Sequence, residues 1–379
     1  MAGIYVHIPF CKSRCIYCGF YSTTHADWQD RYVEALCREM ELRKDCFGKT
    51  ESLKTVYFGG GTPSQLSARN LEKLFLYINK VYQLPSYDGG VEGGPEITLE
   101  CNPDDVTDEF CEALRELPVN RVSLGAQTFD DARLKFLRRR HDSRQIGEAI
   151  RRLREAGIGN ISVDLMFGFP DESLADWASD IDKAVALGVE HLSAYSLMYE
   201  EGTPLYQMAA KNPAMKTDEE LERQMYELLI DRLENAGFEH YEISNFAKPG
   251  FRSRHNSSYW DGTPYVGLGA AAHSYDGKTR LWNVSDLREY VEAIERGTLP
   301  SEHETIDETT HYNDLVTLAL RTREGINLAA LDEKWRNYLL DNARKAIGLD
   351  LLINENGQLH LTRRGLFVSD NVLSDLIFT

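Results

Sequence analysis

The stretch HIPFCKSRCIYCGF occupies residues 7–20 and carries Cys11, Cys15 and Cys18 at the spacing C-x3-C-x2-C. It follows GIYVHI (3–8), a short apolar run that predicts a strand. Three thiols therefore lie on one short loop directly after a strand. The other four cysteines are scattered. A tight cluster in a long chain indicates metal binding or catalysis rather than a disulfide framework.

The spacing differs from that of structural zinc sites, which pair C-x2-4-C with a distant second pair of ligands. No second pair of that type follows. Three thiolates suit three corners of a [4Fe–4S] cubane, whose usual number of cysteine ligands is four. The open iron could chelate the amino and carboxylate groups of S-adenosylmethionine (SAM) and supply the electron that cleaves its sulfonium. We therefore predict a [4Fe–4S] cluster on Cys11, Cys15 and Cys18, with zinc or chance spacing as the alternative.

Further along the chain, apolar strand-like runs alternate with amphipathic helical stretches. This βα repeat predicts a parallel sheet with helices outside it. Six units favour an incomplete barrel over an eight-stranded one. The predicted fold is thus α/β, a partial (β/α)6 barrel. The strand-like runs are 3–8, 55–58, 97–100, 121–125, 161–168 and 191–197, and the helical stretches are 28–42, 67–82, 107–116, a set ending near 156, 174–187 and 217–236.

The barrel and its cluster loop are expected to take up residues 1–236. Within them, the Gly- and Pro-rich segment 80–95 predicts a surface loop. Residues 237–298 are expected to form an irregular extension, because the stretch 238–282 is rich in Gly, His and aromatic residues without a clear period.

Residues 299–379 differ in kind from the barrel. Helical patterns near 308–321 and 329–346 precede two short strands around an Asn-Gly turn, which predicts a small C-terminal α+β domain of winged-helix type. Such domains often bind DNA, but residues 300–379 hold 8 Lys and Arg against 13 Asp and Glu. We therefore expect the domain to pack on the barrel or on a protein partner.

The composition narrows the classes of function. The formal net charge is -18 and no long basic run offsets it, so nucleic acid is a poor partner for this chain. Apolar residues make up 42%, enough for a sizeable core. No stretch approaches the ~20 apolar residues of a membrane-spanning helix, and the N-terminus does not resemble a signal peptide. A cytoplasmic location is expected, with peripheral membrane contact left open.

Four further blocks, each on or beside a predicted strand, extend the pattern. With the cysteine motif they resemble the HemN-like branch of the radical SAM superfamily, and the likeness runs in order over about residues 3–280. That branch contains oxygen-independent coproporphyrinogen III dehydrogenases and heme chaperones. The resemblance implies a [4Fe–4S] cluster and SAM as cofactors. The blocks are GGGTPS (59–64), ITLECNP (97–103), LGAQTF (124–129) and VDLMFGFP (163–170). A later run, YVGLGAAAHS (265–274), is similar to a Gly-rich segment of the heme chaperones.

The resemblance also implies which residues hold SAM, and elementary chemistry agrees with several of them. Glycine leaves room for the methionyl end of the cofactor, although a Gly run also suits an ordinary turn. Glu100 closes a strand at the barrel mouth, where a carboxylate can accept from the amine or ribose. Asp164 lies in an apolar run and needs a partner, either a ribose diol or an arginine. The implied set is Tyr5, Tyr17, Gly60, Gly61, Thr62, Glu100, Gln127, Arg139 and Asp164.

Arg139 shows where sequence alone and the resemblance differ. It lies in the run RRR (138–140), which by charge pattern alone predicts a solvated face. Only its spacing after Gln127 resembles that of the carboxylate-binding arginine of the family.

Two marks separate the members of the branch. The dehydrogenases carry C-x3-C-x2-C-x-C, whereas Phe20 stands here in place of the last cysteine. The block RHNSSYW (254–260) resembles the H-N-x-x-Y-W motif associated with heme in the chaperones. The heme residues implied are His255, Asn256, Tyr259 and Trp260, with His273 as a weaker second ligand. By itself a lone loop histidine more often bonds a carbonyl group.

Two functions of different classes follow. The first is a heme chaperone that binds a [4Fe–4S] cluster, SAM and heme and delivers heme to apo-hemoproteins such as respiratory cytochromes. The alternative is a radical SAM oxygen-independent coproporphyrinogen III oxidase (dehydrogenase) of porphyrin biosynthesis. Phe20 and the H-N-x-x-Y-W block favour the first. A radical enzyme acting on an unrelated substrate is a third possibility. Whether the chain is an enzyme is left open.

Overall fold

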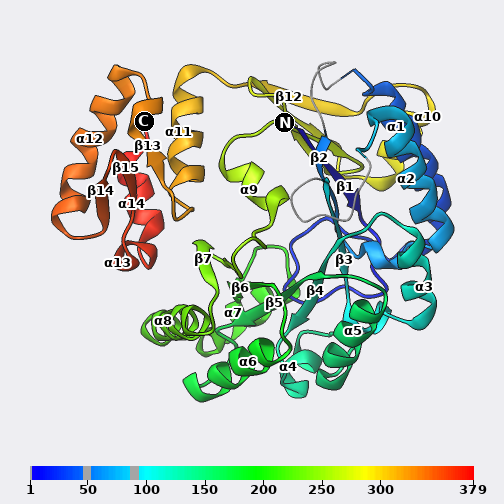
Figure 1. The fold of residues 1–379 in the computed structure, drawn as a ribbon, viewed down its shortest axis with the longest axis horizontal. Coiled ribbons are helices and arrows are strands. Elements are labelled where there is room, and N and C mark those ends of the chain that lie inside the picture. Colours follow the sequence, from blue (N-terminus) through cyan, green and yellow to red (C-terminus); the bar gives the residue numbers. More distant parts are fainter. Residues whose placement is uncertain (1, 46–52, 86–93) are drawn as a thin grey trace.

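Six parallel strands form the centre of the fold, with helices on their outer side (Figure 1). The computed structural model describes residues 2–45, 53–85 and 94–379. Each neighbouring pair of the six strands is parallel and in sequence order, so the predicted partial (β/α)6 barrel is confirmed. The strands are β1 (Ala2–Ile8), β2 (Leu53–Gly60), β3 (Glu96–Cys101), β4 (Arg121–Gln127), β5 (Asn160–Phe167) and β6 (His191–Ser196).

The outer helices form because they bury apolar side chains, and all of them except α1 begin with a side-chain cap. In α5, for example, Ile146, Ile150 and Leu153 are buried, and Asp142 and Gln145 form a capping box. The helices of the barrel are α1 (Gln29–Leu42), α2 (Ala68–Tyr82), α3 (Asp108–Glu116), α4 (Asp131–Phe136), α5 (Ser143–Glu155), α6 (Leu174–Ala186), α7 (Pro204–Lys211) and α8 (Glu219–Asn235). Residues 80–82 of the predicted loop 80–95 belong to α2, and half of the segment, 86–93, lies outside the described residues.

The stretch 237–298 is regular rather than irregular. Its short strands continue the barrel sheet at both edges, so the sheet has the order β12-β11-β10-β9-β1-β2-β3-β4-β5-β6-β8-β7. Strands of three to five residues are too short to show a period, which is why the sequence suggests irregularity. The elements of this stretch are β7 (Glu239–Glu242), β8 (Asn245–Ala247), α9 (Arg254–Trp260), β9 (Tyr265–Leu268), β10 (His273–Tyr275), β11 (Thr279–Asn283) and α10 (Leu287–Glu295). Strand β12 (Ser301–Thr305) follows just after it and forms one edge of the sheet.

A separate sheet and core make up the C-terminal part (Figure 1). Its strands have the order β13-β15-β14, and Asn356 and Gly357 turn the last hairpin with positive φ, as the Asn-Gly pair predicts. The element order fits the predicted winged-helix-like domain. The elements are α11 (Glu308–Ala319), β13 (Ile326–Asn327), α12 (Glu333–Gly348), β14 (Leu352–Glu355), β15 (Gln358–Leu361), α13 (Arg363–Leu366) and α14 (Ser369–Leu376).

This domain packs on the barrel, as expected. Arg321, just after α11, ion-pairs with the buried Glu242 of β7 at 2.9 Å. Backbone bonds from Ile243 to Arg321 and from Arg323 to Tyr241 bind the two segments side by side.

Candidate functional site

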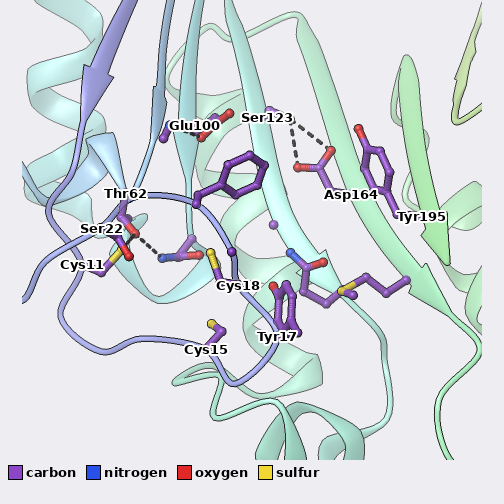
Figure 2. Close-up of a pocket in the computed structure, with 18 of the residues that line it drawn as sticks. Cys11, Cys15, Tyr17, Cys18, Ser22, Thr62, Glu100, Ser123, Asp164 and Tyr195 are labelled. Atoms are coloured by element: carbon purple, nitrogen blue, oxygen red, sulfur yellow. Dashed lines mark hydrogen bonds between the residues drawn. The ribbon is translucent and has the colours of Figure 1, made fainter. Parts of the chain in front are cut away.

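A cavity of about 500 Å³ opens where the central strands end, beside the cysteine loop (Figure 2). The carboxyl ends of parallel strands are the usual place for ligands in such folds. Twelve of the sixteen sequence-predicted site residues line it: Cys11, Cys15, Tyr17, Cys18, Gly60, Gly61, Thr62, Glu100, Gln127, Arg139, Asp164 and Asn256. Tyr5, His255, Tyr259 and Trp260 are not among its lining residues.

The cysteine loop is held in place by its backbone and by one apolar side chain. Cys11 N–H donates to the carbonyl of Thr23, and Thr23 N–H donates to that of Pro9. Between these ends, the buried Ile16 packs in a small apolar cluster with Leu137 and Leu205. The loop therefore stands in a fixed position with its thiols toward the cavity (Figure 2).

The three cysteine thiols suit an iron–sulfur cluster that binds each thiolate at a different iron. All three are free and half-buried, and burial raises the pKa of Cys11 and of Cys18. Within the described ranges, no three metal-binding side chains lie close enough to hold a single ion. A cubane differs from a single ion because it takes each thiolate at a different iron, so its ligands stand farther apart.

The glycine run serves packing as well as access to the cavity. Gly60 has φ +107°, and a Cβ there would lie 2.4 Å from the His7 ring. A Cβ on Gly61 would lie 2.7 Å from the backbone of Pro9. Thr62 follows, and its hydroxyl lies 3.3 Å from Cys11 Sγ. The run thus lets the end of β2 pass against the start of the cysteine loop.

The carboxylate of Glu100 lies beside two hydrogen-bond donors, from Tyr57 and Gly60. Its carboxylate accepts from the Tyr57 hydroxyl at 2.8 Å and from Gly60 N–H at 3.2 Å. Burial, together with the charge of Asp164, outweighs these bonds and raises the pKa of Glu100 to about 7. Near neutral pH this carboxyl group is therefore poised between its two forms.

Asp164 obtains its partner from the neighbouring strand. The Ser123 hydroxyl lies 3.2 and 3.1 Å from the two carboxylate oxygens, as Figure 2 shows. Burial still raises the pKa of Asp164. Glu100 and Asp164 thus face the cavity from β3 and β5, on either side of β4.

Backbone irregularities place Gln127 and Arg139. Gln127 lies at a bulge of β4 with φ +70°, which turns its buried side chain toward the cavity. Arg138, just after α4, has φ +61°, and Arg139 N–H bonds to the Leu134 carbonyl, a Schellman ending. This turn directs the Arg139 side chain toward the cavity.

Arg139 is therefore not on the solvated face that the charge pattern alone predicts. Its guanidinium donates to Asn102 Oδ1 at 2.5 Å and to the Gly125 carbonyl at 2.6 Å, and it lies 3.6 Å from Cys15 Sγ. Tyr17 lines the same part of the cavity. The run RRR predicted exposure because spacing in the sequence does not show the left-handed turn at Arg138.

The H-N-x-x-Y-W block forms α9, which packs against the inner side of β2. His255 is 1% exposed, and both ring nitrogens are engaged, Nδ1 with Thr55 Oγ1 at 2.8 Å and Nε2 with Tyr259 Oη at 2.9 Å. Its ring stacks on Tyr57 at 5.0 Å. Burial lowers the pKa of His255 to about 3. In this arrangement His255 offers no free nitrogen to an iron atom.

Of the other residues implied for SAM and heme, Tyr5 belongs to this stack, whereas Trp260 and His273 lie elsewhere. Tyr5 stacks on Tyr57 and lies within hydrogen-bond distance of His7. Trp260 lies under the Arg321 guanidinium, 4.8 Å from its ring centroid. His273 is exposed on β10 and stacks on Trp282. It lies on a strand separated from β1 by β9.

Several cavity residues were not identified from the sequence. Tyr57 and Arg121 lie within strands, where their alternation with apolar residues gave the only signal. At the mouth of the cavity, Phe20 and Met198 are 70% and 60% exposed. Phe20 was singled out only as a missing cysteine, and the structure adds that it borders the cavity.

No helix in the described part of the chain is long and apolar enough to cross a membrane.

Two family models match the chain. The radical SAM superfamily matches residues 5–184, and the HemN C-terminal domain matches residues 306–368. Among solved structures, coproporphyrinogen III oxidase (HemN) from Escherichia coli has a TM-score of 0.83 at 20% identity, covering 99% of this chain and 89% of that one. This likeness shows the fold.

Curated relatives match over nearly the whole length. The heme chaperone HemW of Bacillus subtilis is 37% identical, covering 98% of this chain and 98% of the relative. HemW of Lactococcus lactis is 33% identical, covering 98% and 96%. HemW of Mycobacterium tuberculosis is 35% identical, covering 99% and 94%. The chain therefore belongs to the radical SAM superfamily and, within its HemN-like branch, to the family of the heme chaperone HemW.

Proposed function

We propose that this protein is a cytoplasmic heme chaperone that binds a [4Fe–4S] cluster, SAM and heme and passes the heme to apo-hemoproteins. Membrane-bound respiratory cytochromes are the expected recipients, reached by peripheral contact with the membrane. The family relationship supports the proposal, because this chain matches relatives named heme chaperone over nearly their full length.

The proposed cofactor site uses residues that already face one cavity. Cys11, Cys15 and Cys18 would hold the cluster, while Glu100 and Asp164 would accept from the amine and the ribose of SAM. Bound together, the cluster and SAM supply an electron and an adenosyl group for radical chemistry. The chain itself positions these groups and shields them from water on the barrel side.

The observation that carries the choice between chaperone and dehydrogenase is Phe20. It stands at the position of the fourth cysteine of the dehydrogenase motif, lines the cavity and is 70% exposed. An exposed aromatic ring at a cavity mouth offers an apolar face to a flat ligand such as a porphyrin. A cysteine there would instead add a thiolate beside the cluster.

The heme site does not fit the structure as the motif suggests. His255 is buried with both nitrogens bonded, so heme ligation by His255 requires α9 to open. His273 is exposed and needs no opening. Both histidines are proposed ligands of the heme iron.

The first experiment is anaerobic. The cluster is reconstituted, SAM and dithionite are added, and coproporphyrinogen III and heme are offered separately. A stable heme complex without decarboxylation supports the chaperone. Formation of protoporphyrinogen would instead establish the dehydrogenase and overturn the proposal. A Phe20→Cys variant serves as the matched control, since it restores the dehydrogenase spacing and nothing else.

The ligand is then assigned with His255→Ala and His273→Ala. Loss of heme binding in only one of them identifies that histidine, while the cluster spectrum should be unchanged in both. Full heme binding by both variants would place the ligand elsewhere.

A further inference from the structure

Arg121 is a buried cation without a partner. It is the first residue of β4, is 1% exposed and lines the cavity. Its Nε and Nη1 atoms are buried and have no hydrogen-bond partner in the described part of the chain. No ion pair within 4.0 Å is formed by Arg121 with any described acid. A guanidinium taken out of water without such partners is costly.

A second polar atom without a partner lies beside it. Thr98 on β3 is directly opposite Arg121 in the strand register and is fully buried. Its hydroxyl has no partner among the described residues either. Adjacent parallel strands point residues in register to the same face. The two strands therefore each carry an unpartnered polar group on the same face, and of the two residues only Arg121 lines the cavity.

Three acids line the cavity, Glu100, Asp164 and Glu200, and none of them forms an ion pair or hydrogen bond with Arg121 in the described part of the chain. Glu100 is already bonded to Tyr57 and Gly60, and Asp164 to Ser123. Arg121 lowers the pKa of each from a distance, yet burial leaves both raised. What is missing next to Arg121 is an anionic group in contact with it.

Arg139, the arginine implied for carboxylate binding, is largely occupied. It donates to Asn102 and to the Gly125 carbonyl, and it lies beside Cys15. Arg121 lines the same cavity, and its Nε and Nη1 have no hydrogen-bond partner among the described residues. A planar guanidinium fork matches a carboxylate with two parallel hydrogen bonds.

We propose that Arg121 binds a carboxylate of the ligand that fills this cavity. The carboxylate comes either from the methionyl end of SAM or from a propionate of a tetrapyrrole. The inference rests on the proposed function, because it takes the cavity to be the ligand site of the chaperone. It assigns to Arg121 a contact that neither the motif nor the resemblance assigns.

The experiment compares wild type, Arg121→Met and Arg121→Lys, all anaerobically reconstituted. Three ligands are titrated: SAM, heme, and heme dimethyl ester, in which the propionates are blocked. Arg344→Met is the matched control, since Arg344 is 79% exposed in the C-terminal domain. Thermal melting checks folding, and replacing a buried charge by Met is often tolerated. Arg121→Lys keeps the charge without the fork, so the proposal predicts an intermediate affinity for it.

A propionate contact predicts that Arg121→Met weakens heme binding by about 10- to 100-fold and leaves the ester unchanged. A methionyl contact predicts the same loss for SAM alone. Unchanged binding of both SAM and heme would overturn the proposal, as would equal losses for heme and its ester. If wild type binds no heme at all, the chaperone function fails, and the SAM titration alone still decides the role of Arg121.

Discussion

Glu100 illustrates at the residue scale how surroundings set the chemistry of a carboxyl group. Its bonds from Tyr57 and Gly60 favour the charged form, whereas burial and the nearby Asp164 disfavour it. Burial and the charge of Asp164 outweigh the two hydrogen bonds and raise the pKa of Glu100 to about 7. A small change of pH near neutrality therefore changes how much of the Glu100 carboxyl group is charged and able to accept hydrogen bonds from a cation.

We predict that the contribution of Glu100 to SAM binding grows with pH. Below about pH 7 the folded protein holds this carboxyl group protonated, and above it the carboxylate can accept from the SAM amine. SAM affinity is measured for wild type and Glu100→Gln between pH 6 and 8. The ratio of the two affinities should rise with pH, and this ratio cancels the titration of SAM itself. A constant ratio would contradict the prediction.

For the cluster, Cys15→Ala should abolish the visible absorbance and the bound iron of the reconstituted protein, because two thiolates hold a cubane poorly. Cys37→Ala is the control, since Cys37 is a free cysteine buried in α1, away from the cavity. Iron content and the spectrum are the measurements. Full iron retention in Cys15→Ala would refute the assignment of the cluster ligands.

The sequence predicted residues of the site where spacing or resemblance reveals them and missed them elsewhere. Cys11, Cys15 and Cys18 are close in sequence, so their proximity follows from covalent geometry. Arg121 and Tyr57 gave no such signal, because an inward position in a strand depends on register with its neighbours. Burial without a partner is a property of the folded chain only.

At the scale of elements, α9 occupies the inner side of the barrel. Glu96 at the start of β3 accepts from the backbone N–H groups of Arg254 and His255, at 3.0 and 2.9 Å. These bonds satisfy free donors at the start of the helix and favour its position by charge. The His255 ring then touches Tyr57, which bonds to Glu100. The helix with the heme-type motif is thus joined to the proposed SAM site.

His255→Ala should lower the free energy of unfolding by about 2–4 kcal/mol, because it removes a buried ring and two hydrogen bonds. Chemical denaturation measures the loss. His273→Ala, at an exposed position, should change stability by less than about 0.5 kcal/mol. Equal stability of the two variants would mean that α9 does not hold the barrel as described. Heme titrations of His255→Ala should be made at a temperature where it remains folded.

The long helices and strands, which have a clear hydrophobic pattern, were predicted well, and the short strands were not. The six central strands and their helices are buried along their length, so their apolar patterns are clear. Strands β7 to β12 have at most five residues and obtain their stability from neighbours in the sheet. No local pattern reveals such pairing, since it joins segments far apart in the sequence, as β1 and β9 do.

At the scale of the whole molecule, the buried histidines and acids set opposite pH dependences. His7, His141, His191 and His255 are buried, and burial lowers the pKa of each, to about 4 for His7 and about 3 for His141 and His255. An unfolded chain binds protons at these sites below about pH 6.5. In the opposite sense, burial raises the pKa of Glu100 and of Glu172 to about 7.

Between about pH 5 and 6.5 the unfolded chain therefore gains more protons at the four histidines than the folded chain retains at the two glutamates. Stability should rise with pH across this window, by about 1–3 kcal/mol per pH unit. Urea unfolding at several pH values measures the slope. His141→Gln should flatten it, because one group that protonates only on unfolding is lost. Glu172→Gln should steepen it, because the opposing group is lost. A slope that both variants change in the same direction would show that these buried groups do not control the acid sensitivity of the fold.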